Sequence, residues 1–148
     1  MEAQQDFKKL LELLNDRGVE YVIVGAHALA FHGAPRYTGD LDIYIRPTAE
    51  NAERVMVALT DFGFGSLGLS EKDFSVPDRV VQLGYPPVRI DLVTSLSGVS
   101  WEDVSANMVD GEYGNVPVKY IGHAEFVRNK RAIGRKKDLA DLEALGIE

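Results

Sequence analysis

The sequence predicts a mixed α/β or α+β domain in which helices flank a small mixed sheet. Apolar residues recur at helical spacing near the start of the chain, and a short β-branched run follows at residues 21–24. Apolar and polar residues then alternate over residues 40–46, as in a strand with two different faces. Because helix-like and strand-like stretches continue to the end without a linker or repeat, we expect a single domain over residues 1–148.

The first half of the chain predicts helix, strand, helix, strand and helix in that order. Residues 21–24 are apolar and lie between glycines, which is typical of a buried strand. Residues 26–31 suit a short helix. Thr48 is a suitable N-cap for a helix that ends at Gly63. The apolar positions of the first helix are Phe7, Leu10, Leu11 and Leu14.

The second half predicts mainly strands followed by helices, which completes the α+β pattern. In chain order we expect a loop over residues 63–77, strands over 79–83 and 88–93, a helix beginning near residue 100, a strand over 116–121, and helices over 124–133 and 137–145.

The composition is that of a soluble globular protein. Hydrophobic residues make up 45% of the 148 residues and charged residues 26%, so the chain can bury a core. Cysteine is absent, which excludes disulfides and thiolate ligands or nucleophiles. The acidic, polar N-terminus is unlike a secretory signal, and no apolar run approaches the roughly 20 residues that span a membrane. We therefore expect a cytoplasmic protein with no membrane partner.

The net charge of −7 argues against a general nucleic-acid coat, since binding of phosphate needs local positive charge. Residues 128–137 are an exception, because they hold six basic residues and no acid. This segment could be a solvated helix face, could contact acidic residues of the body including the aspartates below, or could bind phosphates.

Three features point to a site for phosphate and metal. Gly25 ends a buried strand and opens a helix, where backbone N–H groups can approach a phosphate. Asp40 and Asp42 lie two positions apart on a strand, so both carboxylates project from one face, within reach of a hard cation. Asp91 lies in an otherwise apolar strand, where an unpaired charge is costly.

The simpler alternative is that each aspartate faces solvent on an edge strand. For one such residue this alternative would be preferred. Three acids on two apolar strands, after a strand that ends in glycine, favour a functional site instead. The histidines are expected to pack or to form hydrogen bonds, because Mg²⁺ avoids imidazole. The residues concerned are His27 and His32.

The spacing of these residues resembles the signature of the polymerase β-type nucleotidyltransferase superfamily. That signature is a hydrophobic residue and Gly, then Gly or Ser, a spacer of about nine to thirteen residues, and two acids separated by a hydrophobic residue. Here Gly25 and Ala26 are followed by thirteen residues and then by Asp40 and Asp42. The resemblance extends over residues 20–145.

A narrower resemblance is to a small bacterial branch that includes AbiEii-type toxins. In that branch a Gly-x-x-Arg-x-Thr-x-Asp-x-Asp string is common, and residues 33–42 of this chain match it. The end of the chain resembles a Lys/Arg-x-Lys-Asp-Leu-x-Asp helix of the same group. The matching residues there are Lys130, Arg135, Lys137, Asp138, Leu139 and Asp141.

The resemblance implies a nucleotidyltransferase fold and transfer of a nucleoside monophosphate from an NTP to an acceptor. Asp40 and Asp42 would hold Mg²⁺, or Mn²⁺, ions that bridge the nucleotide phosphates, and Asp91 would complete the site, with the role of general base open to it. The residues implied in nucleotide binding are Gly25, Ala26, Arg36, Thr38, Lys130 and Lys137. From the residues alone, Arg36 could equally form a loop ion pair.

The acceptor stays open between RNA, a protein and a small molecule, with a protein partner or a role in a toxin–antitoxin or phage-defence system among the possibilities. Ala26 stands where family enzymes usually have Gly or Ser, so a hydroxyl ligand for phosphate is missing. This difference motivates an alternative, a non-catalytic module that binds nucleotide or a partner. A metal-dependent phosphohydrolase with the same acids ranks last.

Overall fold

The computed structural model describes residues 4–34, 39–65, 67–85 and 88–147. It confirms the predicted α+β class, because within these residues seven helices surround one six-stranded mixed sheet. The elements are α1 (Gln5–Asp16), β1 (Tyr21–Val24), α2 (Gly25–Phe31), β2 (Asp40–Ile45), α3 (Ala49–Phe62), α4 (Lys72–Ser75), β3 (Val80–Tyr85), β4 (Val88–Val93), α5 (Trp101–Asn107), β5 (Val109–Tyr113), β6 (Val116–Tyr120), α6 (His123–Ile133) and α7 (Lys136–Ala144).

The sheet has the strand order β3-β4-β2-β1-β6-β5. The two central neighbours β2 and β4 are parallel, and β1 pairs with β2 in the antiparallel sense and with β6 in the parallel sense. Antiparallel β3 and β5 form the two edges. The chain therefore crosses over between β2 and β3, and β4 then returns to pair with β2.

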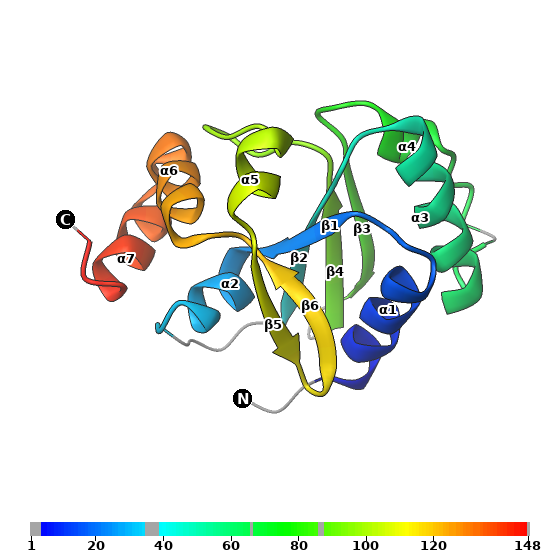
Figure 1. The fold of residues 1–148 in the computed structure, drawn as a ribbon, viewed down its shortest axis with the longest axis horizontal. Helices are drawn as coiled ribbons and strands as arrows, with labels where there is room; N and C mark the ends of the chain where they lie inside the picture. The colour runs from blue at the N-terminus through cyan, green and yellow to red at the C-terminus, as the bar shows by residue number, and fades with distance from the viewer. Residues whose placement is uncertain (1–3, 35–38, 66, 86–87, 148) are drawn as a thin grey trace.

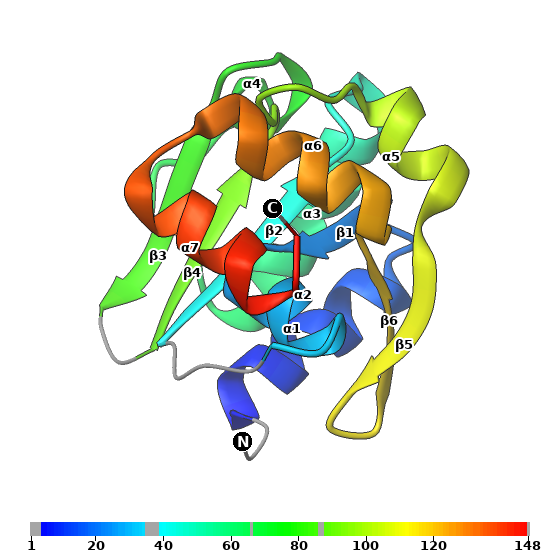
Figure 2. The same cartoon turned by 90° about the vertical axis from the view of Figure 1, so that its left-hand side faces the viewer.

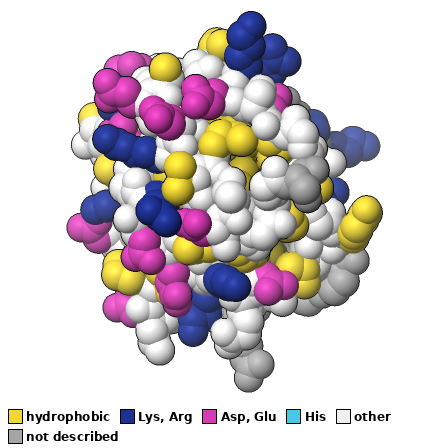
Figure 3. All heavy atoms as spheres, turned by 90° about the vertical axis from the view of Figure 1, so that its right-hand side faces the viewer, with side chains coloured by type: hydrophobic (Ala, Val, Ile, Leu, Met, Phe, Trp, Pro, Cys, Tyr) yellow, Lys and Arg dark blue, Asp and Glu magenta, His cyan; other side chains and the backbone are white. Residues whose placement is uncertain are grey.

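Helices cover both faces of the sheet. Figure 1 shows α1, α3 and α4 on one side of the sheet and α6 and α7 on the other. In Figure 2 α6 and α7 cross in front of the central strands. On the side of α1, α3 and α4, acidic and basic side chains are interspersed, as Figure 3 shows, which is typical of a solvated surface.

The alternation predicted for β2 explains why the sheet has one purely apolar face. Leu41, Ile43 and Ile45 are completely buried in the core. The four apolar positions predicted for the first helix, on α1, are buried as well. Burial of these side chains is the main stabilising contribution to the fold.

The predicted helix ends of α3 are confirmed. The Thr48 hydroxyl accepts a hydrogen bond from the Asn51 N–H, and Gly63 ends the helix with a φ of 105°. A left-handed residue at this position satisfies the last carbonyls and suits glycine. Trp101 and Phe126 are buried in the core.

Two elements were missing from the prediction. The expected loop over residues 63–77 contains the single turn α4, which forms because Phe74 is completely buried. Residues 109–113 form the edge strand β5, although their polar composition carries no clear strand pattern. Gly111 in β5 leaves room for Phe31 and Tyr120, whose rings stack with centroids 4.1 Å apart.

Within the described part of the chain, no helix combines the length and the apolar character that crossing a membrane would require.

Candidate functional site

The three predicted carboxylates meet on one face of the sheet. In the parallel pairing of β2 with β4, Asp42 lies opposite Asp91 and Asp40 lies opposite Arg89. Because side chains two positions apart on a strand share a face, these four residues form a square on the face away from Leu41 and Ile43. The pairing of two strands that are far apart in the sequence thus creates the cluster.

Arg89 is a member of the site that the sequence reasoning missed. Its Nη2 donates to Oδ2 of Asp40 at 3.1 Å and to Oδ2 of Asp91 at 3.2 Å. The signal was available, since Arg89 lies two residues before Asp91 and must share its face. A guanidinium has five N–H donors in a fixed fork, which suits it to join two carboxylates.

Asp42 is the most perturbed carboxyl of the square. Burial raises its pKa, and the negative charges of Asp91 and Asp40 raise it further, to about 6, while the positive charge of Lys130 opposes this rise. In its protonated form Asp42 hydrogen-bonds to Asp91. The positive charges of Arg89 and Lys130 therefore offset part of the negative charge that these carboxylates bring together.

Gly25 brings the turn after β1 into contact with this square. Its φ is 66°, and a Cβ added there would lie 2.2 Å from Oδ2 of Asp42. Glycine is thus required both by the backbone conformation and by the close approach of the carboxylate. Ala26, the next residue, is buried in α2. The turn expected to approach a phosphate therefore lies directly beside the aspartates.

The predicted basic residues of the last two helices lie in different environments. Lys130 of α6 is buried, and its Nζ lies 3.2 Å from Asp138 and 3.2 Å from Asp141 of α7. Lys137 is exposed on α7. Lys130 is therefore held by α7, and its charge still acts on Asp42.

Asp138 is the centre of this second charged cluster. Burial would raise its pKa, but hydrogen bonds from Arg135 and Lys130 outweigh burial and lower the pKa to about 2. Arg135 donates through its backbone N–H and its guanidinium, so Asp138 also caps α7. The basic segment of residues 128–137 was expected to face solvent, to contact acidic residues or to bind phosphates. Arg135 and Lys130 contact acidic residues.

Arg36 and Thr38, the remaining residues expected to bind nucleotide, lie outside the described residues. His27 packs as expected, since its buried ring lies 5.8 Å from that of Phe7 and 5.5 Å from that of Tyr113. Burial lowers the pKa of His27. His32 forms a hydrogen bond with the Ile121 carbonyl, also as expected.

The fit of the square to a divalent metal can be judged from its atoms. In the conformation of the described residues, no three Asp, Glu or His side chains are close enough together to hold a metal ion. However, Asp91 Oδ1 is buried and receives no hydrogen bond from a described nitrogen or hydroxyl, and Arg89 already places a cation between two of the carboxylates. The donors are hard oxygens, which suit Mg²⁺ and Mn²⁺. The chemistry of the donors therefore suits such an ion, although the described side chains are not arranged around one.

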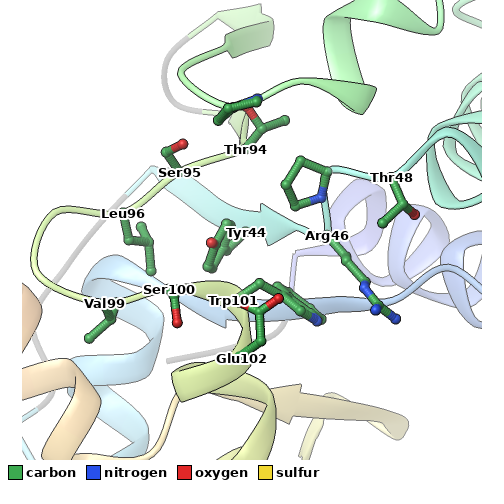
Figure 4. A pocket seen from close by; sticks show the side chains of 12 residues that line it. Tyr44, Arg46, Thr48, Thr94, Ser95, Leu96, Val99, Ser100, Trp101 and Glu102 are labelled. Carbon is green, nitrogen blue, oxygen red and sulfur yellow. The ribbon is translucent and has the colours of Figure 1, made fainter.

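A cavity of about 300 Å³ opens at the other end of β2 and β4. Tyr44 lies on the same face of β2 as Asp42 and meets Trp101 of α5 edge to face, with ring centroids 5.2 Å apart. Figure 4 shows both rings with Thr48, Ser95 and Glu102 around this space. The cavity thus lies beyond Tyr44 of β2 and beside residues 94–96, which follow β4.

Comparison with known proteins identifies the fold. No family model and no curated protein matches the sequence. A candidate nucleotidyltransferase from Thermotoga maritima is structurally similar, with a TM-score of 0.64, 14% identity, and coverage of 94% of this chain and 89% of that one. The antibiotic-resistance factor ANT(2'')-Ia gives 0.63 at 12% identity, covering 95% and 80% of the two chains.

The lincomycin-bound lincosamide antibiotic adenylyltransferase LnuA is also similar, with a TM-score of 0.58 at 11% identity over 98% of this chain and 97% of that one. The chain therefore has the nucleotidyltransferase fold that the sequence resemblance implied.

Proposed function

We propose that this protein is a divalent-metal-dependent nucleotidyltransferase, which moves a nucleoside monophosphate from an NTP to an acceptor. The observation that carries the proposal is the position of the three carboxylates. Asp40 and Asp42 on β2 and Asp91 on β4 share one sheet face, directly beside the Gly25 turn, in a nucleotidyltransferase fold. Similar structures include enzymes that transfer nucleotides, which supports this class of reaction.

Each residue has a role in this proposal. Asp40, Asp42 and Asp91 would hold Mg²⁺ or Mn²⁺, and such ions would supply charge stabilisation for the attacking and leaving oxygens. The acceptor oxygen bonds to the α-phosphorus, the bond to the leaving pyrophosphate breaks, and Asp91 takes the proton of the acceptor hydroxyl. The backbone at Gly25 and Ala26 binds phosphate oxygens, with further contacts from Arg36, Thr38, Lys130 and Lys137.

The acceptor is an RNA, a protein or a small molecule, and the resemblance to AbiEii-type toxins supports a test for a toxin–antitoxin or phage-defence role. The small-molecule class is supported by the structurally similar lincosamide adenylyltransferase LnuA, which was solved with lincomycin bound. The cavity beyond Tyr44 has a volume at the lower end of the range of small-molecule sites. A cytoplasmic location remains a prediction.

The experiment is a transfer assay with each α-labelled NTP, Mg²⁺ or Mn²⁺, and three acceptor pools, namely total RNA, lysate protein and small-molecule extract. The Asp40→Asn/Asp42→Asn variant removes two carboxylate charges from the site. The matched control is Asp61→Asn/Asp110→Asn, which removes two carboxylates that form ion pairs with Arg17 and Lys119. We expect label to move to one pool with the wild type and the control variant, and not with the site variant.

The second candidate is a non-catalytic module that binds nucleotide or a partner, and Ala26 is the observation that favours it, because the hydroxyl usual at this position is missing. Metal-dependent NTP binding without transfer to any pool would support this module. Growth arrest on expression, relieved by the Asp40→Asn/Asp42→Asn substitution, would instead support the toxin role.

A further inference from the structure

Arg89 lies where a divalent ion would have to bind. A single nitrogen of its guanidinium is 3.1 Å from a carboxylate of β2 and 3.2 Å from a carboxylate of β4. These carboxylates belong to Asp40 and Asp91, which lie diagonally across the square. A cation that joins Asp40 to Asp91 must therefore share the space of this nitrogen.

We propose that Arg89 occupies the cation position of the metal-free protein and that a divalent metal binds by displacing its guanidinium. The inference deepens the proposed function and rests on its metal site. It assigns Arg89 as a positioning residue, which holds the Asp40 and Asp91 carboxylates around one cationic nitrogen and competes with the metal for them.

The charges in the square favour this exchange. The three carboxylates of the square lie around the guanidinium of Arg89, and the positive charge of the buried Lys130 also acts on Asp42. A divalent ion would place two positive charges among these carboxylates, where the guanidinium places one. Hard oxygen ligands also suit Mg²⁺ and Mn²⁺, which bind at about 2.0–2.2 Å. The strand pairing between Asp42 and Asp91 fixes the backbone. Side-chain rotation alone can then bring the carboxylates from hydrogen-bonding distance to ligand distance.

The guanidinium is held imperfectly, which makes it displaceable. The Arg89 Nε–H is buried and has no hydrogen-bond partner among the described residues, and an unsatisfied buried donor carries a desolvation cost. The side chain as a whole is 30% exposed, so it has a route to solvent. An arginine can keep its aliphatic stem packed while its charged end moves into water.

The test measures metal binding without nucleotide, by titration with Mn²⁺ and Mg²⁺ in calorimetry and Mn²⁺ spin resonance. Arg89→Gln removes the competing charge, and Arg89→Lys keeps a charge without the planar fork. The control is Arg17→Gln, which breaks an ion pair with Asp61 at the end of α1. We expect Arg89→Gln to bind Mn²⁺ about tenfold more tightly than wild type, Arg89→Lys to lie between them, and Arg17→Gln to match the wild type.

A second measurement follows Arg89 in the wild-type protein and uses a variant only for assignment. The Nε–H resonance of Arg89, assigned by its loss in Arg89→Lys, is followed in the wild type during Mg²⁺ titration. We expect this resonance to shift or exchange faster as metal binds, while that of Arg17, whose Nε–H donates to Asp61, stays constant.

Two results would overturn the inference. One is Mn²⁺ binding to Arg89→Gln that is no tighter than to wild type, and the other is an Arg89 resonance that does not respond while metal binds. The transfer assay is independent of both, since Arg89 can compete with metal in a protein that transfers nothing. Conversely, transfer with an undisturbed Arg89 would keep the proposed function and remove this inference.

Discussion

Gly25 shows how one residue can fix the geometry of a site. Substitution by alanine adds a Cβ that would lie 2.2 Å from the Asp42 carboxylate, at a φ of 66°. Gly18 offers a matched control, because its φ is 69° and its added Cβ would meet nothing within 4 Å. Alanine at either position would have an unfavourable positive φ, but only alanine at position 25 would also clash with the Asp42 side chain.

We expect Gly25→Ala to lower the free energy of unfolding by about 3 kcal/mol and Gly18→Ala by about 1 kcal/mol. Urea denaturation of both variants measures the difference, which isolates the contact with Asp42. Equal losses would mean that the turn relaxes away from the carboxylate and that close approach is not required.

Asp42 makes the stability of the metal-free protein depend on pH. Its folded-state pKa of about 6 lies above the ordinary aspartate value of 3.8, so the folded protein binds more protons than the unfolded chain between these values. The stabilising contribution is therefore fully present below about pH 4 and is lost as the pH rises through about 6.

We expect this loss to be on the order of 2 kcal/mol between pH 4 and pH 7.5. It is measured by urea unfolding in the presence of a chelator, and Asp42→Asn should flatten the profile over this range. A wild-type profile that parallels that of Asp42→Asn would show that Asp42 is already ionised at low pH.

Helix α7 depends on a buried charge cluster rather than on apolar contacts alone. Asp138 is completely buried and accepts hydrogen bonds from Arg135 and Lys130. Because removal of its charge leaves Lys130 buried with less compensation, we expect Asp138→Asn to cost about 3 kcal/mol. Hydrogen exchange should localise the loss to α7, and Glu143→Gln, an exposed substitution on the same helix, should leave exchange unchanged. Uniform exchange across the whole chain would argue against a local role.

The same cluster has the opposite pH dependence from Asp42. The pKa of Asp138 is lowered to about 2, below the ordinary aspartate value of 3.8. Its contribution is thus present above about pH 4 and lost as the pH falls through about 2. The protein should therefore lose the support of α7 in strong acid, which acid titration monitored by exchange in α7 can detect.

Elements with local patterns could be predicted from the sequence, and those that depend on distant partners could not. The alternation from Asp40 to Ile45 and the caps Thr48 and Gly63 are local, and they were predicted correctly. Strand β5 forms because β6 offers it an edge, and α4 forms because Phe74 finds the core. The residues of β5 and α4 alone do not show that β6 and the core will contact them.

In the candidate site, too, the local pattern could be predicted and the contacts between distant segments could not. Spacing along β2 indicated a paired carboxylate site, but the position of Asp91 beside it depends on the strand order of the whole sheet. The spacing of Arg89 and Asp91 already placed Arg89 on the face of the aspartates, but its position opposite Asp40 follows only from the strand register. The Lys130 cluster likewise needs the packing of α7 on α6.

At the scale of the whole molecule, metal and nucleotide should stabilise the fold by mass action. At ligand concentrations about 100 times the dissociation constant, bound Mg²⁺ and NTP would add about 2.7 kcal/mol, enough to raise the Tm by several degrees. The Asp40→Asn/Asp42→Asn variant should show no such rise, and Asp61→Asn/Asp110→Asn should show it in full. A rise in the site variant would locate the ligand elsewhere.

The pairing of β2 with β4 also determines when the site can come into existence. These strands are separated in the sequence by α3, α4 and β3, so the square of four residues requires closure of a long loop. On the ribosome, the segment with Asp40 and Asp42 emerges first and has neither Arg89 nor Asp91 to pair with. The site can form only after residues 88–93 have been synthesised, because β4 carries both the last carboxylate, Asp91, and the guanidinium of Arg89.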